Sequence, residues 1–196
     1  MFLWSFPVVT AGLGIWQVYR YQWKLNLIKQ AQDSLDKKPL KDPTNEPYRR
    51  IQLNGTLEDE KILVNGVENG VRGHYVIQPY IINNQRILIQ RGFQKDGKTL
   101  TTTSDQGLVL QNEQQGYRPD NNNTVWYWKD INTISKLFHT DPILIGMIKN
   151  EQHKSGIEAK PGYHNNHMQY IITWFTLSVF TAAAITFKRK KTTFRI

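Results

Sequence analysis

The chain has 196 residues, a formal net charge of +9 and no cysteine. The absence of cysteine excludes disulfides, iron–sulfur clusters and thiolate zinc sites. All 16 acidic residues and 20 of the 25 basic ones lie between residues 20 and 167, so much of the excess charge belongs to a basic C-terminus, and we expect no nucleic-acid partner.

Two uncharged segments, one near each end, predict transmembrane helices. Phe2–Tyr19 holds eighteen uncharged residues before Arg20, and Met168–Phe187 holds twenty. Twenty helical residues span about 30 Å, the thickness of a bilayer core. We interpret the first segment as a retained anchor and not as a cleaved signal peptide, because no basic residue precedes it and no small-x-small cleavage site follows it.

The sequence divides into five parts. They are the first membrane helix (1–20), a helical extension with a linker (21–46), a β-rich domain (47–160), the second membrane helix with the loop that leads into it (161–187), and a basic tail (188–196). The tail carries five basic residues and no acidic one, which predicts that it faces the cytoplasm or the mitochondrial matrix. The β-rich domain is then expected on the opposite side of the membrane, although Arg20 and Lys24 argue mildly for the reverse.

Between the spans, the pattern predicts the end of a helix followed by strands. Apolar residues spaced among polar ones continue the first helix beyond the membrane until Pro39 and Pro43 end it. The stretches "YRRIQLNGTL" and "EKILVNG" predict one hairpin. A second hairpin joins Tyr75–Ile82 to Arg86–Phe93 through the turn-forming "NNQ".

The rest of the domain is expected to be a loop, two strands and a short helix. Lys95–Asp105 is polar and predicts an exposed loop, and "GLVLQNE" predicts a fifth strand. Asp130 is a candidate N-cap for an amphipathic helix from Ile131 to Phe138, and Pro142 begins a last strand, "PILIGMIK". The predicted fold class is a membrane protein in which two transmembrane helices flank a small antiparallel α+β, barrel-like soluble domain.

One face of the first span carries a candidate contact surface. Gly12, Trp16 and Arg20 follow one another at one-turn intervals, so a notch, an indole and a guanidinium share a helical face. Such a face can take a partner helix or the edge of a flat cofactor. The alternative is that the glycine is simply tolerated in a helix that faces lipid.

One face of the second span carries a candidate ligand. His167, Tyr170 and Trp174 lie on one side of the helix, and His164 precedes them as a weaker candidate. A histidine at a membrane edge can be an axial haem ligand, a transient metal ligand, or a polar residue bonded to headgroups and loop backbone. The residues alone leave these alternatives open. Common hydrolase, zinc-protease and phosphate-loop motifs are absent from the sequence, so we expect no enzyme activity.

Four stretches, taken together, resemble the surfeit locus protein 1 family, the membrane assembly factors of cytochrome c oxidase. They are "GLGIWQVYRYQWKLNLI", "PYRRIQLNGTL", "RILIQRGF" and "NHMQYIITWFTLS", in the family's order and across nearly the whole chain. The resemblance implies a multi-pass protein of the mitochondrial inner membrane with its domain in the intermembrane space. A bacterial plasma membrane with a periplasmic domain is the alternative.

The resemblance also implies a role in delivering or stabilising haem a in the oxidase catalytic subunit. Haem a would be held transiently and not firmly, with His167 as the candidate ligand of its iron and no other metal. Trp16, Tyr170 and Trp174 would form apolar walls around it.

The implied partners are the catalytic subunit, neighbouring oxidase subunits and the lipid bilayer. The face of Gly12, Trp16 and Arg20 is the expected contact with the oxidase. Two alternatives stay open: a permanently bound accessory subunit of the oxidase, and an unrelated two-pass protein of the secretory pathway that would carry glycan on Asn54 or Asn122.

Overall fold

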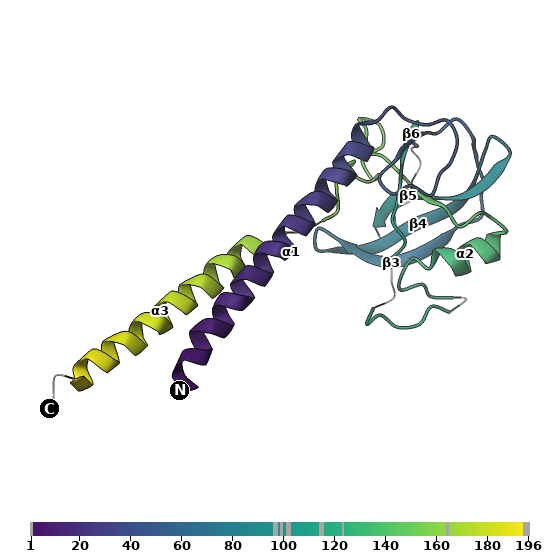
Figure 1. The fold of residues 1–196 in the computed structure, drawn as a ribbon. Helices are drawn as coiled ribbons and strands as arrows, with labels where there is room; N and C mark the ends of the chain where they lie inside the picture. The colour runs from purple at the N-terminus through teal and green to yellow at the C-terminus, as the bar shows by residue number, and fades with distance from the viewer. Residues whose placement is uncertain are drawn as a thin grey trace. The chain divides into compact units, whose positions relative to one another are not determined.

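A computed structural model describes residues 2–95, 98, 100, 103–113, 116–122, 124–163 and 165–193 (Figure 1). His164 and part of the predicted Lys95–Asp105 loop lie outside the described residues. The chain forms two compact units, one made of Met1–Gln30 with Gly162–Ile196 and the other of Ala31–Pro161.

The first unit is helical. A short 3₁₀ helix, η1 (Phe2–Trp4), leads into α1 (Ser5–Asp36), and α3 (His167–Thr193) returns near the end of the chain. Pro7 is tolerated in the first turn of α1, where backbone N–H groups have no partner within the helix. The predicted continuation of the first helix past residue 20 is confirmed, since α1 ends at Asp36, three residues before Pro39.

One helix among the described residues is long and apolar enough to cross a membrane. It is the His167–Lys188 part of α3, with a mean hydropathy of 1.6. This candidate coincides with the second predicted span. The Phe2–Tyr19 segment is helical, but α1 is not a candidate by the same measure.

The second unit is built on a seven-stranded sheet that curls into a half-barrel (Figure 1). The strand order is β1-β6-β7-β5-β4-β2, with β3 also pairing β4. The strands are β1 (Arg50–Gln52), β2 (Thr56–Leu57), β3 (Ile62–Glu68), β4 (Val71–Ile82), β5 (Gln85–Lys95), β6 (Gln106–Val109) and β7 (Leu144–Met147).

The predicted antiparallel sheet is wrong at one pair, because β5 and β7 are parallel. Parallel neighbours need a long crossover connection, and here β6 and the helix α2 (Ile131–Phe138) fill it. The sheet is therefore mixed. Strand-like runs in the sequence do not reveal which strands such a crossover joins.

The two predicted hairpins had different outcomes. The hairpin of β4 and β5 is confirmed, with Asn83 and Asn84 at positive φ in a two-residue turn. The hairpin expected between residues 48–57 and 60–66 is wrong: β1 pairs β6, β2 pairs β4, and β3 pairs β4. Asn69 and Gly70, both at positive φ, form the tight turn that joins β3 to β4 instead.

The predicted helix and the last two strands are present. Asp130 caps α2, since its Oδ1 accepts a hydrogen bond from the Thr133 backbone N–H at 3.2 Å. His139 ends the helix in the left-handed conformation. β6 and β7 are each shorter than the sequence predicted.

The sheet buries apolar residues on both faces. α2 covers one face, which explains why the central strands show apolar runs and not simple alternation. One cluster holds Ile51, Leu53, Tyr80, Ile82, Ile87, Ile89, Val109, Ile143, Ile145 and Met147. The other holds Ile62, Val64, Ile77, Leu88, Trp126, Ile131, Ile134, Phe138 and Leu144.

Candidate functional site

The candidate site lies in the first unit, where α1 and α3 run side by side (Figure 1). The buried residues of α1 in this unit are spaced by three and four positions and comprise Pro7, Thr10, Gly14 and Gln17. This spacing produces one narrow stripe along the helix. The stripe is the surface that α1 presents to α3.

Three contacts show that the two helices are antiparallel. The Ser178 hydroxyl donates to the backbone carbonyl of Pro7 at 2.8 Å. A Cβ added to Gly14 would lie 3.0 Å from the ring of Phe175. Near the end of the first predicted span, the side chain of Gln17 is hydrogen-bonded to His167. Hydrogen bonds and small residues therefore join the pair, as is usual between helices in lipid.

The contact between Gln17 and His167 is the chemically informative one. Gln17 is 9% exposed, and its Oε1 lies 2.7 Å from Nδ1 of His167. An amide oxygen only accepts hydrogen bonds, so Nδ1 donates its proton to Gln17, and the neutral form of the ring then has its lone pair on Nε2. The described residues offer Nε2 no hydrogen-bond partner. Histidines that ligate metals typically donate their second N–H in this way.

The donor set of this contact fits a haem iron. A neutral imidazole whose orientation is fixed by one hydrogen bond presents its other nitrogen as a ligand. His167 stands at the first position of α3, where its backbone N–H donates to Oδ1 of Asn165 at 3.3 Å. The ring is therefore held at the end of the helix pair and half-buried.

The structure separates the residues predicted as apolar walls. Trp174 is half-buried on the same side of α3 as His167. Trp16 and Tyr170 are each 53% exposed, so they lie mostly outside the contact between the helices. Trp16 and Tyr170 therefore do not enclose the histidine.

The predicted face of Gly12, Trp16 and Arg20 lies outside the helix contact. A Cβ added to Gly12 would meet nothing within 4 Å. The Arg20 guanidinium stacks over the ring of Trp23 at 4.3 Å, along its own helix. Among the described residues, this face is therefore open to lipid or to a partner.

Two residues of the site were missed from the sequence. Gly14, and not Gly12, is the small residue on which α3 packs, and Gln17 orients the histidine. The three-and-four spacing of Pro7, Thr10, Gly14 and Gln17 was the available signal. It was obscured because two of these residues are polar and therefore do not stand out in a membrane span.

A cationic contact ties the connecting loop to α1. The Lys24 ammonium lies 4.9 Å from the centre of the Tyr163 ring, just before α3 begins. Basic and aromatic residues paired in this way are typical of the interface between membrane and water.

Residues 5–179 of the chain match the SURF1 family. The SURF1-like protein of Monosiga brevicollis is 32% identical over 95% of this chain and 86% of its own length. The SURF1-like protein of Dictyostelium discoideum is 27% identical over 88% of this chain and 89% of its own. Surfeit locus protein 1 of Rattus norvegicus is 29% identical over 92% and 72%, respectively. The chain therefore belongs to the SURF1 family.

Proposed function

We propose that this protein assists the biogenesis of cytochrome c oxidase by transiently holding haem a for the catalytic subunit. Membership of the SURF1 family supports the role in oxidase assembly. The single observation that supports the haem part is the His167 imidazole, whose Nδ1 is bound to Gln17 and whose Nε2 is available. The role is one of binding and positioning, without a catalytic step.

The proposal gives each residue of the helix pair a defined task. Haem a, when bound, would supply an iron that an imidazole nitrogen can ligate. Nε2 of His167 would hold that iron, and Gln17 orients the ring through its hydrogen bond to Nδ1. Trp174, with the more exposed Trp16 and Tyr170, provides the apolar walls.

The proposal includes two membrane spans. Residues 2–19 are uncharged, and this part of α1 packs along α3, the candidate span, from Pro7 to Gln17. Large apolar residues cover its outer side, as lipid requires; they include Leu3, Phe6, Val8, Val9 and Ile15. A helix that lies beside a membrane span over this length is itself expected in the membrane.

The proposed location is the mitochondrial inner membrane, with the β domain in the intermembrane space. The eukaryotic relatives support a mitochondrion over the bacterial alternative, and the basic tail supports the orientation. Protease added from the intermembrane-space side should cut the Lys95–Asp105 loop and spare the tail. Cleavage of the tail alone would reverse the topology.

The proposal is tested by the loss of oxidase when His167 is replaced. His167→Ala should reduce the amount of assembled oxidase and its haem a content, while the level and the membrane insertion of the protein stay unchanged. Met168→Ala, an adjacent and exposed position, and His164→Ala serve as controls that should have little effect. If His167→Ala matches these controls, the histidine is a polar anchor at the membrane surface.

A permanently bound accessory subunit is the second candidate. The exposed outer face of α1, which includes Gly12, Trp16 and Arg20, favours it, because fixed contacts with oxidase subunits could cover this face. Stoichiometry in purified oxidase separates the two functions. An assembly factor should be substoichiometric in the mature enzyme, and an accessory subunit should be present at one copy per enzyme.

A further inference from the structure

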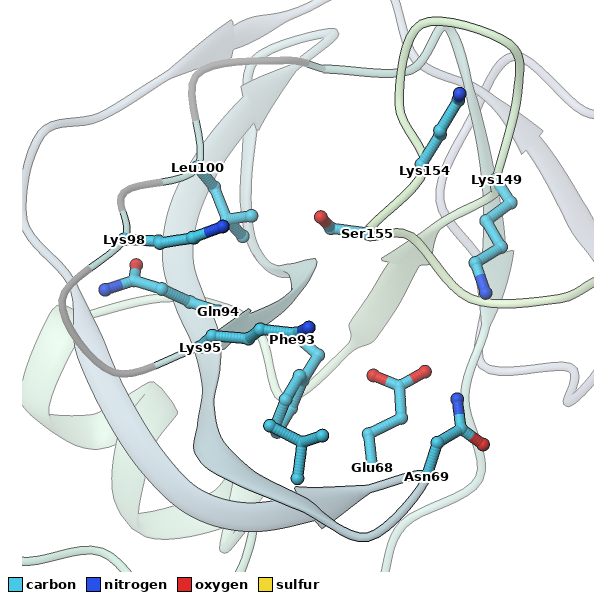
Figure 2. A pocket seen from close by; sticks show the side chains of 11 residues that line it. Glu68, Asn69, Phe93, Gln94, Lys95, Lys98, Leu100, Lys149, Lys154 and Ser155 are labelled. Atoms are coloured by element: carbon cyan, nitrogen blue, oxygen red, sulfur yellow. The ribbon is translucent and has the colours of Figure 1, made fainter.

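A cleft of about 390 Å³ lies in the β domain (Figure 2). The described residues that line it all belong to this unit. Three segments form it: the turn between β3 and β4, the end of β5 with the residues that follow, and the loop after β7. Its volume is in the range of small-molecule sites, which is roughly 300–1,000 Å³.

A β-bulge in β5 lets the loop after β7 approach closely. The pairing of β4 with β5 shifts register at Val76 and Ile77, and Arg91 is the extra residue on β5. Gly92, which follows, has a φ of +146°, and a Cβ added to it would lie 2.0 Å from the carbonyl oxygen of Ser155. Only glycine permits this contact. The "RGF" of the sequence thus has a structural task.

Hydrogen bonds then fix the loop in place. The Phe93 backbone N–H donates to the Ser155 carbonyl at 3.0 Å. His153 is fully buried, and its Nε2 lies 2.5 Å from the carbonyl oxygen of Arg91, to which it donates. The backbone N–H of His153 donates to Oδ1 of Asn150 at 2.6 Å. The loop therefore presents its side chains from a defined backbone.

Four lysines line the cleft, two from each side. Lys95 and Lys98 come from the end of β5 and the residues after it, and Lys149 and Lys154 come from the loop after β7 (Figure 2). Glu68 is the one carboxylate among the described residues that line it. Like charges around one concave surface raise its potential, which an anion in the cleft would relieve.

The lysine charges are poorly compensated within the described residues. Lys149 has one long ion pair, with Glu158 at 3.9 Å. The described residues form no ion pair with Lys95, Lys98 or Lys154. Their ammonium groups are thus available to a ligand.

The donors and the walls of the cleft indicate the class of anion. Lysine binds phosphate as a point charge with three donors, and four lysines around one cleft can meet the multiple negative charge of a phosphate group. Phe93, Val71 and Leu100 add apolar wall, and Asn69 offers an amide beside Glu68. We propose that the cleft binds a phosphate-bearing ligand, with the phosphate among the lysines and the rest of the ligand toward Asn69 and the apolar wall.

Such a ligand can be a soluble phosphate compound or a phospholipid headgroup. The full chain in uncharged maltoside micelles should be titrated calorimetrically with pyrophosphate and, separately, with monomeric dihexanoyl phosphatidylglycerol. Binding of pyrophosphate alone indicates a soluble ligand, and tighter binding of the short-chain lipid indicates a headgroup. Both results support a phosphate site.

The variants locate the binding. Lys95→Gln combined with Lys154→Gln should weaken it by about tenfold or more, because two charge-assisted contacts are lost. Lys38→Gln with Lys41→Gln makes the same charge change at exposed positions outside the cleft and should leave the affinity nearly unchanged. Glu68→Gln should tighten binding a few-fold, by about the effect of one weak charge contact.

The proposal is overturned by three results. The first is that neither probe binds, and the second is an equal loss in the cleft and control variants, which would indicate general attraction to a basic protein. The third is tighter binding of a glutamate-rich peptide through the same lysines, which would assign the cleft to an acidic protein segment. Circular dichroism checks that each variant is folded. Oxidase assembly need not be measured, so failure here does not affect the proposed function.

Discussion

Between α1 and α3 the side chains are mostly small or polar, and the large apolar ones face outward, whereas the β domain has the reverse arrangement. Thr10 and Gln17 are buried in the helix pair, and Trp16 is exposed. In the β domain, Ile87 and Ile145 are fully buried. Burial from water stabilises the domain. Hydrogen bonds and close packing join α1 to α3, as expected for the proposed pair of membrane helices.

The same type of residue therefore contributes differently to stability in the two regions. An isoleucine is essential in the domain and replaceable on the outer face of a helix. A glycine matters where another group approaches its Cα closely or where its φ is positive.

The largest effect is expected at Gly92. Alanine there would place Cβ against the Ser155 carbonyl at a φ that side chains rarely adopt. Gly92→Ala should lower the free energy of unfolding of the domain by about 4 kcal/mol or more, or prevent folding. Denaturation followed by tryptophan fluorescence measures it. A loss below about 1 kcal/mol would mean that the loop after β7 is not held against β5.

The next effect compares two isoleucines. Ile145 is fully buried in the sheet, and Ile172 in α3 is 61% exposed. Ile145→Ala should cost about 3 kcal/mol of domain stability through lost burial and a cavity. Ile172→Ala should cost less than about 0.5 kcal/mol in micelles, because the side chain leaves one apolar environment for another. Equal losses of stability at the two positions would contradict the claim that burial of apolar side chains stabilises the β domain but not the outer face of α3.

A third prediction compares two glycines of α1. Gly14→Leu would force its side chain into the Phe175 ring and should weaken helix pairing by about 2 kcal/mol. Gly12→Leu should leave the pairing intact, since its Cβ meets nothing. The rate of disulfide formation between cysteines introduced at Pro7 and Ser178 reports the pairing.

Gly12→Leu has a separate readout. If the Gly12, Trp16 and Arg20 face contacts the oxidase, the variant should insert normally and lose co-purification with the catalytic subunit. Unchanged co-purification would show that this face is exposed to lipid.

The smallest effect concerns an ion pair on the domain. Arg86 lies 2.5 Å from Oε2 of Glu58 and holds the pKa of that carboxyl below its ordinary value. The pair therefore adds stability above pH about 4.5, and this is lost as the pH falls through the lowered pKa. Glu58→Gln should cost about 1 kcal/mol at neutral pH and nothing once the wild-type carboxyl is protonated. A pH-independent difference would indicate packing instead.

Local chemistry explains which parts of the fold could be predicted. The Asn83–Asn84 turn and the Asp130 cap act within a few residues, so the second hairpin and α2 could be located from the sequence. Strand order depends on partners that are distant in the sequence. The parallel pairing of β5 with β7 and the pairing of β1 with β6 could therefore not be predicted.

The candidate site shows the same limit. The spacing of His167, Tyr170 and Trp174 could be seen from the sequence, but Gln17 lies 150 positions earlier and is joined to His167 only by the fold. The lysines of the cleft are likewise scattered from Lys95 to Lys154. Their charges converge because a buried histidine and a glycine hold the loop after β7.

The most direct test of the account is a titration of haem a into the purified chain in uncharged micelles, followed by absorbance. The wild type should show a histidine-ligated spectrum, and His167→Ala should lose it. Gln17→Leu should keep the ligand but weaken the affinity by about tenfold, because the imidazole is no longer oriented. Identical spectra and affinities for the wild type and His167→Ala would contradict the assignment of His167 as the haem ligand.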